Sequence, residues 1–439
     1  MFKGSSILYT LISCCILCGS IGCENTKIFA NYEPDRIIEE TAPRSVGICE
    51  NDEDCPQWSC VKTQCEQGVC IPMRIPISTL WAQEVDAAQS FVSLALSSEE
   101  LVALKGEVKE ELRVLPAPLH SLGEGDQLIR WSSSSTRDLK TPLTETEPDE
   151  WKPVLERITL RPAIGMDQAP TEQREPLSIN GVSIAGGKVV LTAGETHRDL
   201  WIGAWGSDPD RGRYDRLAAP AQHILLDEDE LWVSVFDKGL ERLDLAEVSR
   251  ASDETEAFEA NARFNTPGRA LSARAGRSFV VVADGYAGIS LFSKRAIDAL
   301  DTSGAARRLM TPPQELPTQG RAVHLDLIED LLISAELGVG LSIVRITPEE
   351  GLTTEVKLEM GGEVRWVNWV DPFTALVWVE GRGVIVLDRL TEAGLPQELA
   401  QVEYRDISAA LWSATGGRFA FLTSEGRLHE GALKCSGGD

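Results

Sequence analysis

Short apolar runs separated by glycine-containing turns recur along the C-terminal half of the chain. The clearest example is residues 269–293, where an apolar run from Phe279 to Ala283 precedes a glycine turn and a second apolar run ends at Phe292. Runs of this length, rich in Val, Ile, Leu and aromatic residues, are typical of antiparallel strands joined by tight turns. The pattern predicts a small β-meander here.

This unit repeats. Aligning the copies on the glycine between the two apolar runs gives successive separations of 49, 52, 43 and 43 residues, with an earlier copy at 177–205 and a fainter one at 89–115. A repeat of about 40–50 residues is the length of a propeller blade, and the runs lack the 3.6-residue period of a helical solenoid. We therefore expect an all-β fold with a β-propeller over residues 75–439. Seven blades are favoured and eight are the alternative. The aligned glycines are Gly239, Gly288, Gly340, Gly383 and Gly426.

Two stretches bear on how such a ring is completed. Residues 132–176 are rich in Ser, Thr, Glu and Pro, so we expect a polar insertion or an irregular blade there. Residues 75–81 are β-leaning and follow a cysteine cluster directly. They are predicted to pair beside residues 427–433 and to close the propeller.

The copy Val384-Ile385-Val386-Leu387-Asp388 resembles the LVIVD-repeat β-propellers of bacterial exported proteins. The likeness covers about residues 177–433, with a looser match at 240–245, and the copy at 289–293 has lost the acid. The resemblance implies a fold and no particular reaction.

The N-terminus has the proportions of an export signal. Lys3 precedes an uncharged apolar stretch from Ile7 to Ile21, which is short for a membrane span. The sequence Ser20-Ile21-Gly22-Cys23 resembles the lipobox of bacterial lipoproteins, although leucine is usual at the place of Ser20. This resemblance implies a lipoprotein signal peptide over 1–22, lipidation of Cys23 and a flexible tether over 23–48. An ordinary signal peptide with Cys23 as a spare thiol is the alternative.

Cysteines are concentrated next to this tether. Five lie within residues 49–72 and one lies near the C-terminus, while the chain between them has none. The spacing lacks the paired CxxC knuckles of a zinc site, so we predict a disulfide-rich segment over 49–72. Because five is odd, the sixth cysteine is expected to bond to one of the cluster and so to tie the two ends together. The predicted disulfide residues are Cys49, Cys55, Cys60, Cys65, Cys70 and Cys435.

Net charge excludes one class of partner. The chain carries a formal charge of −26, with a pI of about 4.7 and a mean hydropathy of −0.11. Nucleic-acid binders carry a basic footprint, so nucleic acid is not an expected partner. We expect a soluble, solvated acidic surface.

Candidate chemistry is sparse. His223 and His324 occupy similar positions in the opening strands of two units, so they could face the propeller channel and hold a metal, although structural histidines are the simpler interpretation. Asp208, Asp210 and Asp215 alternate around a glycine as in calcium loops, but Ala219 stands where an EF-hand has its glutamate. No cofactor is expected, with Ca²⁺ as the weak alternative. Aromatic residues gather in the last two units and predict packing between blades, or alternatively an exposed stacking surface: Trp366, Trp369, Phe373, Trp378 and Trp412.

These features predict a lipid-anchored β-propeller at the bacterial cell envelope, on the periplasmic face or the cell surface. It would bind an envelope protein or glycan without catalysis of its own. The alternative is an envelope hydrolase or lyase with a metal-assisted site at the channel, and no catalytic residue is assigned.

Overall fold

The computed structural model describes residues 47–435 except 57–59, 85–90, 97–99, 106–126, 133–151, 158–178, 186–187, 194–198, 205–212, 218–220, 228–229, 245–261, 295–306, 309–312, 348–350, 390–394, 405–406 and 414–417. The chain divides into compact units at residues 1–42 and 43–439, and all described residues belong to the second. This unit is built of β-strands, with one short 3-10 helix, η1 (Asp52–Asp54), among its described residues. None of the helical residues described forms a segment long and apolar enough to cross a bilayer.

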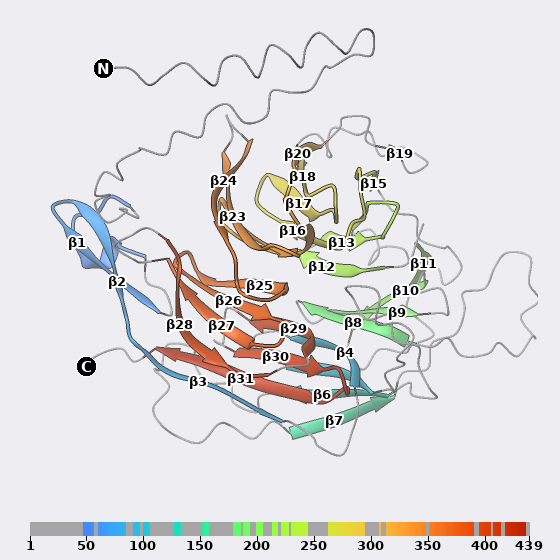
Figure 1. The fold of residues 1–439 in the computed structure, drawn as a ribbon. Helices are drawn as coiled ribbons and strands as arrows, with labels where there is room; N and C mark the ends of the chain where they lie inside the picture. Colours follow the sequence, from blue (N-terminus) through green and yellow to red (C-terminus); the bar gives the residue numbers. More distant parts are fainter. Residues whose placement is uncertain are drawn as a thin grey trace, which may run out of the picture. The chain divides into compact units, whose positions relative to one another are not determined.

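Strands that follow one another in the chain form antiparallel sheets (Figure 1). The four-stranded sheets are β4 (Phe91–Leu96), β5 (Glu100–Lys105), β6 (Gln127–Ser132) and β7 (Lys152–Arg157); β8 (Ile179–Ala185), β9 (Lys188–Ala193), β10 (Asp199–Ala204) and β11 (Arg213–Arg216); β16 (Ser272–Ala275), β17 (Phe279–Ala283), β18 (Ile289–Ser293) and β20 (Gln314–Leu316); β21 (Arg321–Ile328), β22 (Leu331–Leu337), β23 (Gly340–Thr347) and β24 (Gly351–Leu358); β25 (Val364–Asp371), β26 (Thr374–Val379), β27 (Gly383–Asp388) and β28 (Gln397–Val402); and β29 (Ile407–Ser413), β30 (Arg418–Thr423), β31 (Leu428–Cys435) and β3 (Ile77–Glu84). A further sheet has β12 (His223–Asp227), β13 (Glu230–Ser234), β14 (Leu240–Asp244) and β15 (Ala262–Phe264), plus β19 (Arg307–Arg308), which pairs in parallel.

The opening strands of these sheets contact one another in a closed cycle: β4, β8, β12, β16, β21, β25, β29 and again β4. Sheets that each touch two neighbours around a ring form a β-propeller, so the predicted fold class is confirmed. Seven sheets take part in this cycle. Within the described residues six of them are regular four-stranded blades, one fewer than the seven blades favoured from the sequence. The other sheet of the cycle differs because β19 adds a fifth strand.

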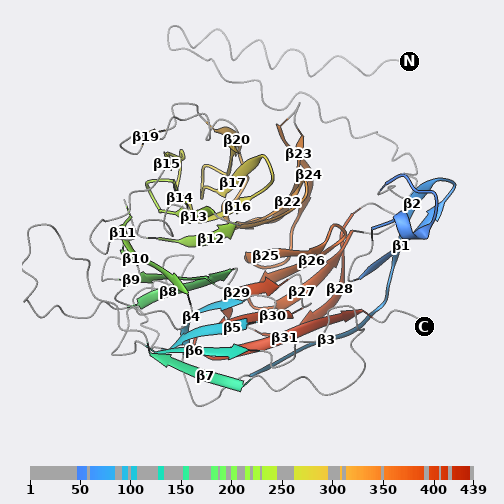
Figure 2. The ribbon, with the colours of Figure 1, turned by 180° about the vertical axis from the view of Figure 1, so that it is seen from behind.

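The ring closes by pairing the two ends of the described chain. β3 lies antiparallel to β31, with Leu80 opposite Leu433, and both ribbon views show the two strands side by side (Figures 1 and 2). The predicted pairing of residues 75–81 with 427–433 is confirmed. β7 lies inside the polar stretch 132–176 and completes a four-stranded sheet, while most of that stretch is outside the described residues.

The repeated glycine has a geometric cause. Gly288 directly precedes β18 and Gly340 is the first residue of β23, with φ of +92° and +137°. A Cβ atom would lie 2.3 Å from the Leu316 oxygen at the first position and 2.0 Å from the Leu358 oxygen at the second. Glycine is needed because the outermost strand passes too close for a side chain.

Apolar side chains pack between neighbouring blades. One core cluster joins Ile333 and Ile343 to Val367, Val377 and Ile385, across two consecutive sheets. The predicted packing role of the aromatic group holds for its described side chains, since none is more than 8% exposed; Trp412 lies outside that description. The buried members are Trp366, Trp369, Phe373 and Trp378.

A buried carboxylate recurs at the end of the second strand of two consecutive blades, with Asp284 directly after β17 and Glu336 near the end of β22. Asp284 Oδ2 accepts hydrogen bonds from Gly268 N (2.8 Å) and Ser290 Oγ (3.3 Å). Glu336 accepts from Gly320 N (3.4 Å) and Ser342 Oγ, at the same sequence offsets. Each carboxylate thus joins the end of the second strand to the segment that precedes the first strand and to the third strand of the same blade. Burial raises the pKa of Asp284 above its ordinary value, against the effect of these hydrogen bonds.

Candidate functional site

Three disulfides organise the cysteine-rich segment. Cys49 bonds to Cys65 and Cys55 to Cys70, around the hairpin of β1 (Val61–Glu66) and β2 (Val69–Arg74). Of the five partners that the sequence left open for Cys435, the structure selects Cys60. Cys60 also packs with Phe419, Phe421 and Leu433 of the last blade. The hairpin is therefore joined covalently to the C-terminal end of the ring.

Among the described residues, one set of three potential metal-binding side chains lies close together, and it is Cys49, Cys55 and Cys70. All three sulfur atoms are consumed by disulfides. The segment is therefore a cross-linked structural element, as its spacing predicted.

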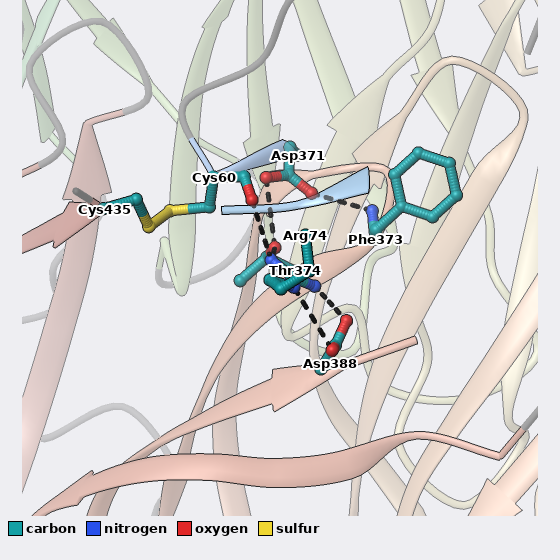
Figure 3. Close-up of a disulfide and its surroundings, with 7 residues drawn as sticks. All are labelled: Cys60, Arg74, Asp371, Phe373, Thr374, Asp388 and Cys435. Atoms are coloured by element: carbon teal, nitrogen blue, oxygen red, sulfur yellow. Dashed lines mark hydrogen bonds and ion pairs between the residues drawn. A yellow bond between two sulfur atoms is a disulfide. The ribbon is translucent and has the colours of Figure 1, made fainter. Parts of the chain in front are cut away.

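Arg74, the last residue of β2, fastens the hairpin to the blade β25–β28 (Figure 3). Its guanidinium forms a two-pronged ion pair with Asp388, with Nε 3.2 Å from Oδ2. Nη1 donates to Thr374 Oγ1 at 2.7 Å and to the Cys60 carbonyl at 3.2 Å. Forked guanidinium–carboxylate pairs are directional, so Arg74 fixes the orientation of the hairpin on the blade.

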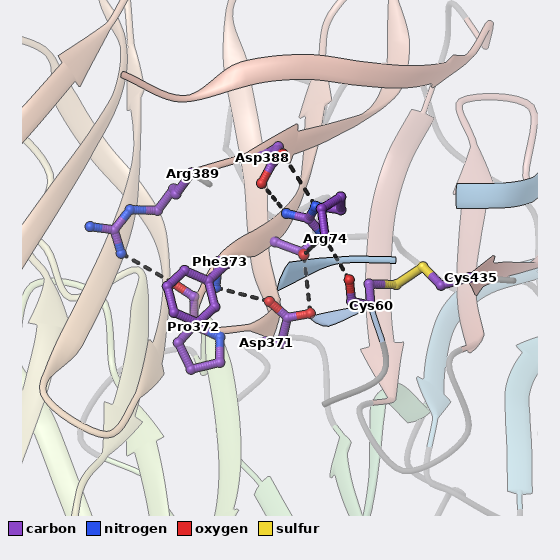
Figure 4. Close-up of polar contacts among 9 residues, drawn as sticks. Cys60, Arg74, Asp371, Pro372, Phe373, Asp388, Arg389 and Cys435 are labelled. Atoms are coloured by element: carbon purple, nitrogen blue, oxygen red, sulfur yellow. Dashed lines mark hydrogen bonds and ion pairs between the residues drawn. A yellow bond between two sulfur atoms is a disulfide. The ribbon is translucent and has the colours of Figure 1, made fainter. Parts of the chain in front are cut away.

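One acceptor of Arg74, the Thr374 hydroxyl, is held by a second carboxylate, that of Asp371 (Figure 4). Asp371 Oδ2 accepts from Thr374 Oγ1 at 3.0 Å and Oδ1 accepts from Phe373 N at 2.9 Å. Burial raises the pKa of Asp371, although these hydrogen bonds and the charge of Arg74 oppose the shift. The polar groups here serve attachment, and the sequence offered no sign of them beyond an arginine beside the cysteine cluster.

A second polar group lies on the opening strands of four consecutive sheets of the ring, and we call it the inner-strand cluster. Asp326 of β21 is its centre. Oδ1 accepts from Arg274 Nε of β16 at 2.8 Å, and Oδ2 accepts from Asn368 Nδ2 (2.7 Å) and Trp369 N (2.8 Å) of β25. The cluster consists of His223, Arg274, His324, Asp326 and Asn368.

The two predicted channel histidines meet in this cluster. Their ring centroids are 6.2 Å apart in an edge-to-face arrangement, although His223 belongs to β12 and His324 to β21. His223 Nε2 lies 3.1 Å from Arg274 Nη1, and His324 Nδ1 accepts weakly from Val367 N at 3.5 Å. An arginine can only donate, so His223 Nε2 is the acceptor and its proton lies on Nδ1.

Both histidines are held neutral. Burial and the charge of Arg274 lower the pKa of His223 to about 3. Burial, Arg274 and His223 place the pKa of His324 well below its ordinary value, against the opposing hydrogen bond from Val367. Neutral imidazoles are what metal ions bind, but both oxygens of Asp326 are already engaged. Through Asp326 the cluster joins neighbouring blades.

Strand register explains which members the sequence could have supplied. His324 and Asp326 are two residues apart, so both point to the same face of β21, opposite Ala335 and Ile333. Arg274 in β16 and Asn368 in β25 occupy the position that Asp326 has in β21. Their cross-strand partners are Val281 and Leu376. The sequence signal for these residues is a polar side chain at the same position of three consecutive opening strands, two residues after the position of His324. A search for histidines alone does not find it.

The other predicted site residues are not brought together. Cys23, Asp208 and Asp210 lie outside the described residues, and for Asp215 the structure gives its place in β11 without describing its side chain. The calcium-loop hypothesis therefore stays a prediction.

Comparison with known proteins identifies the architecture alone. No protein-family model matches the chain, and no curated protein matches it in sequence. Among solved structures, the fold is similar to a chain of the "Crystal Structure of Mitotic Checkpoint Complex", with a TM-score of 0.53, 8% identity, and coverage of 82% of this chain and 93% of that one. It is also similar to the "Structure of U3-55K", with a TM-score of 0.51, 12% identity, and coverage of 82% and 100%. At such low identity these similarities concern the fold alone, and together with the closed cycle of sheets they show that this chain contains a β-propeller.

Proposed function

We propose that this protein is a non-catalytic binding scaffold that presents a partner-binding surface on a β-propeller. The observation that carries the proposal is the inner-strand cluster, whose central carboxylate spends both oxygens on bonds to neighbouring strands. Propellers commonly bind ligands at the channel mouth and through the loops between strands, while the blades stay rigid. Polar contacts between neighbouring blades, such as those of Asp326, would keep the ring rigid while the loops bind a partner.

We also propose a location for the protein, at the bacterial cell envelope. The lipobox-like residues ending at Cys23 support a lipid anchor, and the three disulfides support an oxidising compartment such as the bacterial envelope. The LVIVD-like copy at 384–388 supports membership of that group of exported propellers. An acylated cysteine would anchor the chain to a membrane face without spanning it.

Two experiments test these parts separately. Cross-linking in the native cell, followed by identification of the captured protein, tests the scaffold, and repeated failure to recover any specific partner argues against it. Fractionation of the full chain and its Cys23→Ala variant tests the anchor. The wild-type protein should sediment with membranes and the variant should not, and equal distribution of the two would exclude lipidation of Cys23.

A metal-assisted hydrolase or lyase is the second candidate, supported by the edge-to-face approach of two neutral histidines, His223 and His324. Metal analysis of the purified full chain discriminates between the two. A stoichiometric transition metal that is lost in the His223→Gln/His324→Gln variant would favour the enzyme.

A further inference from the structure

The junctions between consecutive blades carry a repeated arginine. Ala270 and Ala322 each form a bridge to the turn of the preceding blade, through Ala270 N to Phe236 O (2.9 Å) and Ala322 N to Gly285 O (3.0 Å). The residue before each alanine is an arginine, Arg269 or Arg321. The same backbone bridge therefore places a cation at the same point of two neighbouring junctions.

Each of these arginines lies against an aromatic ring of the preceding turn. Arg269 Cζ is 4.7 Å from the centroid of Phe236, and Arg321 Cζ is 5.7 Å from that of Tyr286. The Tyr286 side chain is 85% exposed. A guanidinium beside an aromatic face keeps its hydrogen-bond donors pointing outward while the ring holds its plane.

Neither arginine forms an ion pair among the described residues, and Arg321 Nη2 is buried without a hydrogen-bond partner. Arg365 of β25, whose charge acts on Arg321, is itself neutralised by Glu380 (2.8 Å) and Glu363 (3.1 Å). Burial, followed by the charges of Arg269 and Arg365, lowers the pKa of Arg321, while Tyr286 opposes the shift. The chain has a formal charge of −26. Two neighbouring arginines that form no ion pair among the described residues therefore make a small positively charged region on a mainly acidic protein.

We propose that Arg269, Arg321 and the exposed ring of Tyr286 form a binding site for an acidic peptide segment of a partner protein. This deepens the proposed scaffold function and rests on it. The two cations stand on successive blades, each beside its own ring, so the site has two separate cation–aromatic positions. A chain with acidic side chains at intervals can use both positions, whereas one small anion can use a single one.

Isothermal titration of the purified full chain with hexaglutamate tests the site. We expect binding that weakens roughly tenfold in Arg269→Gln or Arg321→Gln, the size of one charge-assisted hydrogen bond, and that disappears in the double variant. Arg277→Gln is the matched control and should bind as wild type, because Arg277 is an exposed arginine at the turn between β16 and β17. Glu363→Gln/Glu380→Gln releases Arg365 and should strengthen binding.

Unchanged binding in the double variant, or no hexaglutamate binding by the wild type, would overturn the proposal. Binding of inorganic phosphate without hexaglutamate binding would replace the peptide with a small anion and would also overturn it. Cross-linking separates this inference from the scaffold function. A partner still captured by the Arg269→Gln/Arg321→Gln variant leaves the scaffold standing and removes this site, whereas hexaglutamate binding without any cellular partner does the reverse.

Discussion

At the scale of single residues, two histidines beside an arginine make the stability of the folded protein depend on pH. His223 and His324 are neutral in the folded chain because burial disfavours the imidazolium and Arg274 repels it. In the unfolded chain a histidine titrates near pH 6.5. Below that pH the unfolded state binds protons that the folded state does not accept, so both histidines favour unfolding as the pH falls below about 6.5. For His223 this effect continues down to its folded-state pKa of about 3.

We predict that the free energy of unfolding falls from pH 7 to pH 5, with His223 contributing about 2 kcal/mol of the loss. The His223→Gln variant lacks this proton uptake and should lose about that much less over the same interval. Urea denaturation at the two pH values measures both losses, and the difference between the variants removes the shared effect of carboxylates. Equal losses in the two proteins would mean that His223 is not buried neutral.

Sequence reasoning at this scale depended on residue type. His223 and His324 stand out in the sequence because they occupy similar positions in the opening strands of two units, and the structure does bring them together. Asp326 and Arg274 were passed over because charged residues are common in this sequence, and nothing local distinguishes them from solvated ones. Their importance comes from register across strands that are far apart in the sequence.

Within the blade, the recurring element is a turn held by a carboxylate. Asp284 and Glu336 bind the backbone of Gly268 or Gly320 and the hydroxyl of Ser290 or Ser342. The sequence revealed the glycines of these turns, because their spacing is regular. The acids were less visible, because the same position carries Val235 in one copy and Val379 in another.

We predict that Asp284→Ala lowers the free energy of unfolding by about 2 kcal/mol, since Gly268 N and Ser290 Oγ lose their acceptor inside the blade. Asp284→Asn keeps a carbonyl acceptor without burying a charge, so its loss should be smaller. Asp237→Ala, at the exposed turn of the preceding sheet, is the control and should change stability by less than about 0.5 kcal/mol. Chemical denaturation orders the three variants, and a loss in Asp237→Ala as large as that in Asp284→Ala would contradict the argument.

At the scale of the whole molecule, closure combines three interactions of different kinds. β3 adds to β31 by strand pairing, Cys60 bonds to Cys435, and Arg74 binds Asp388 in the neighbouring blade. The pairing and a bond from Cys435 to the cluster could be predicted from cysteine parity and from the position of residues 75–81. The choice of Cys60, and the contribution of Arg74, depend on how the hairpin is seated, which no local pattern specifies.

Since Cys60 and Cys435 are separated by 375 residues, their bond restricts the unfolded chain far more than the bonds inside the hairpin. The chain-entropy model gives about 5 to 6 kcal/mol for such a loop and about 3 kcal/mol for a loop of 16 residues, the separation of Cys49 and Cys65. We therefore predict that Cys60→Ser/Cys435→Ser lowers the urea midpoint more than Cys49→Ser/Cys65→Ser does. The ring should stay closed in both, because strand pairing and the Arg74–Asp388 ion pair remain. The opposite order of midpoints would show that the hairpin, rather than the seam, limits the stability of the propeller.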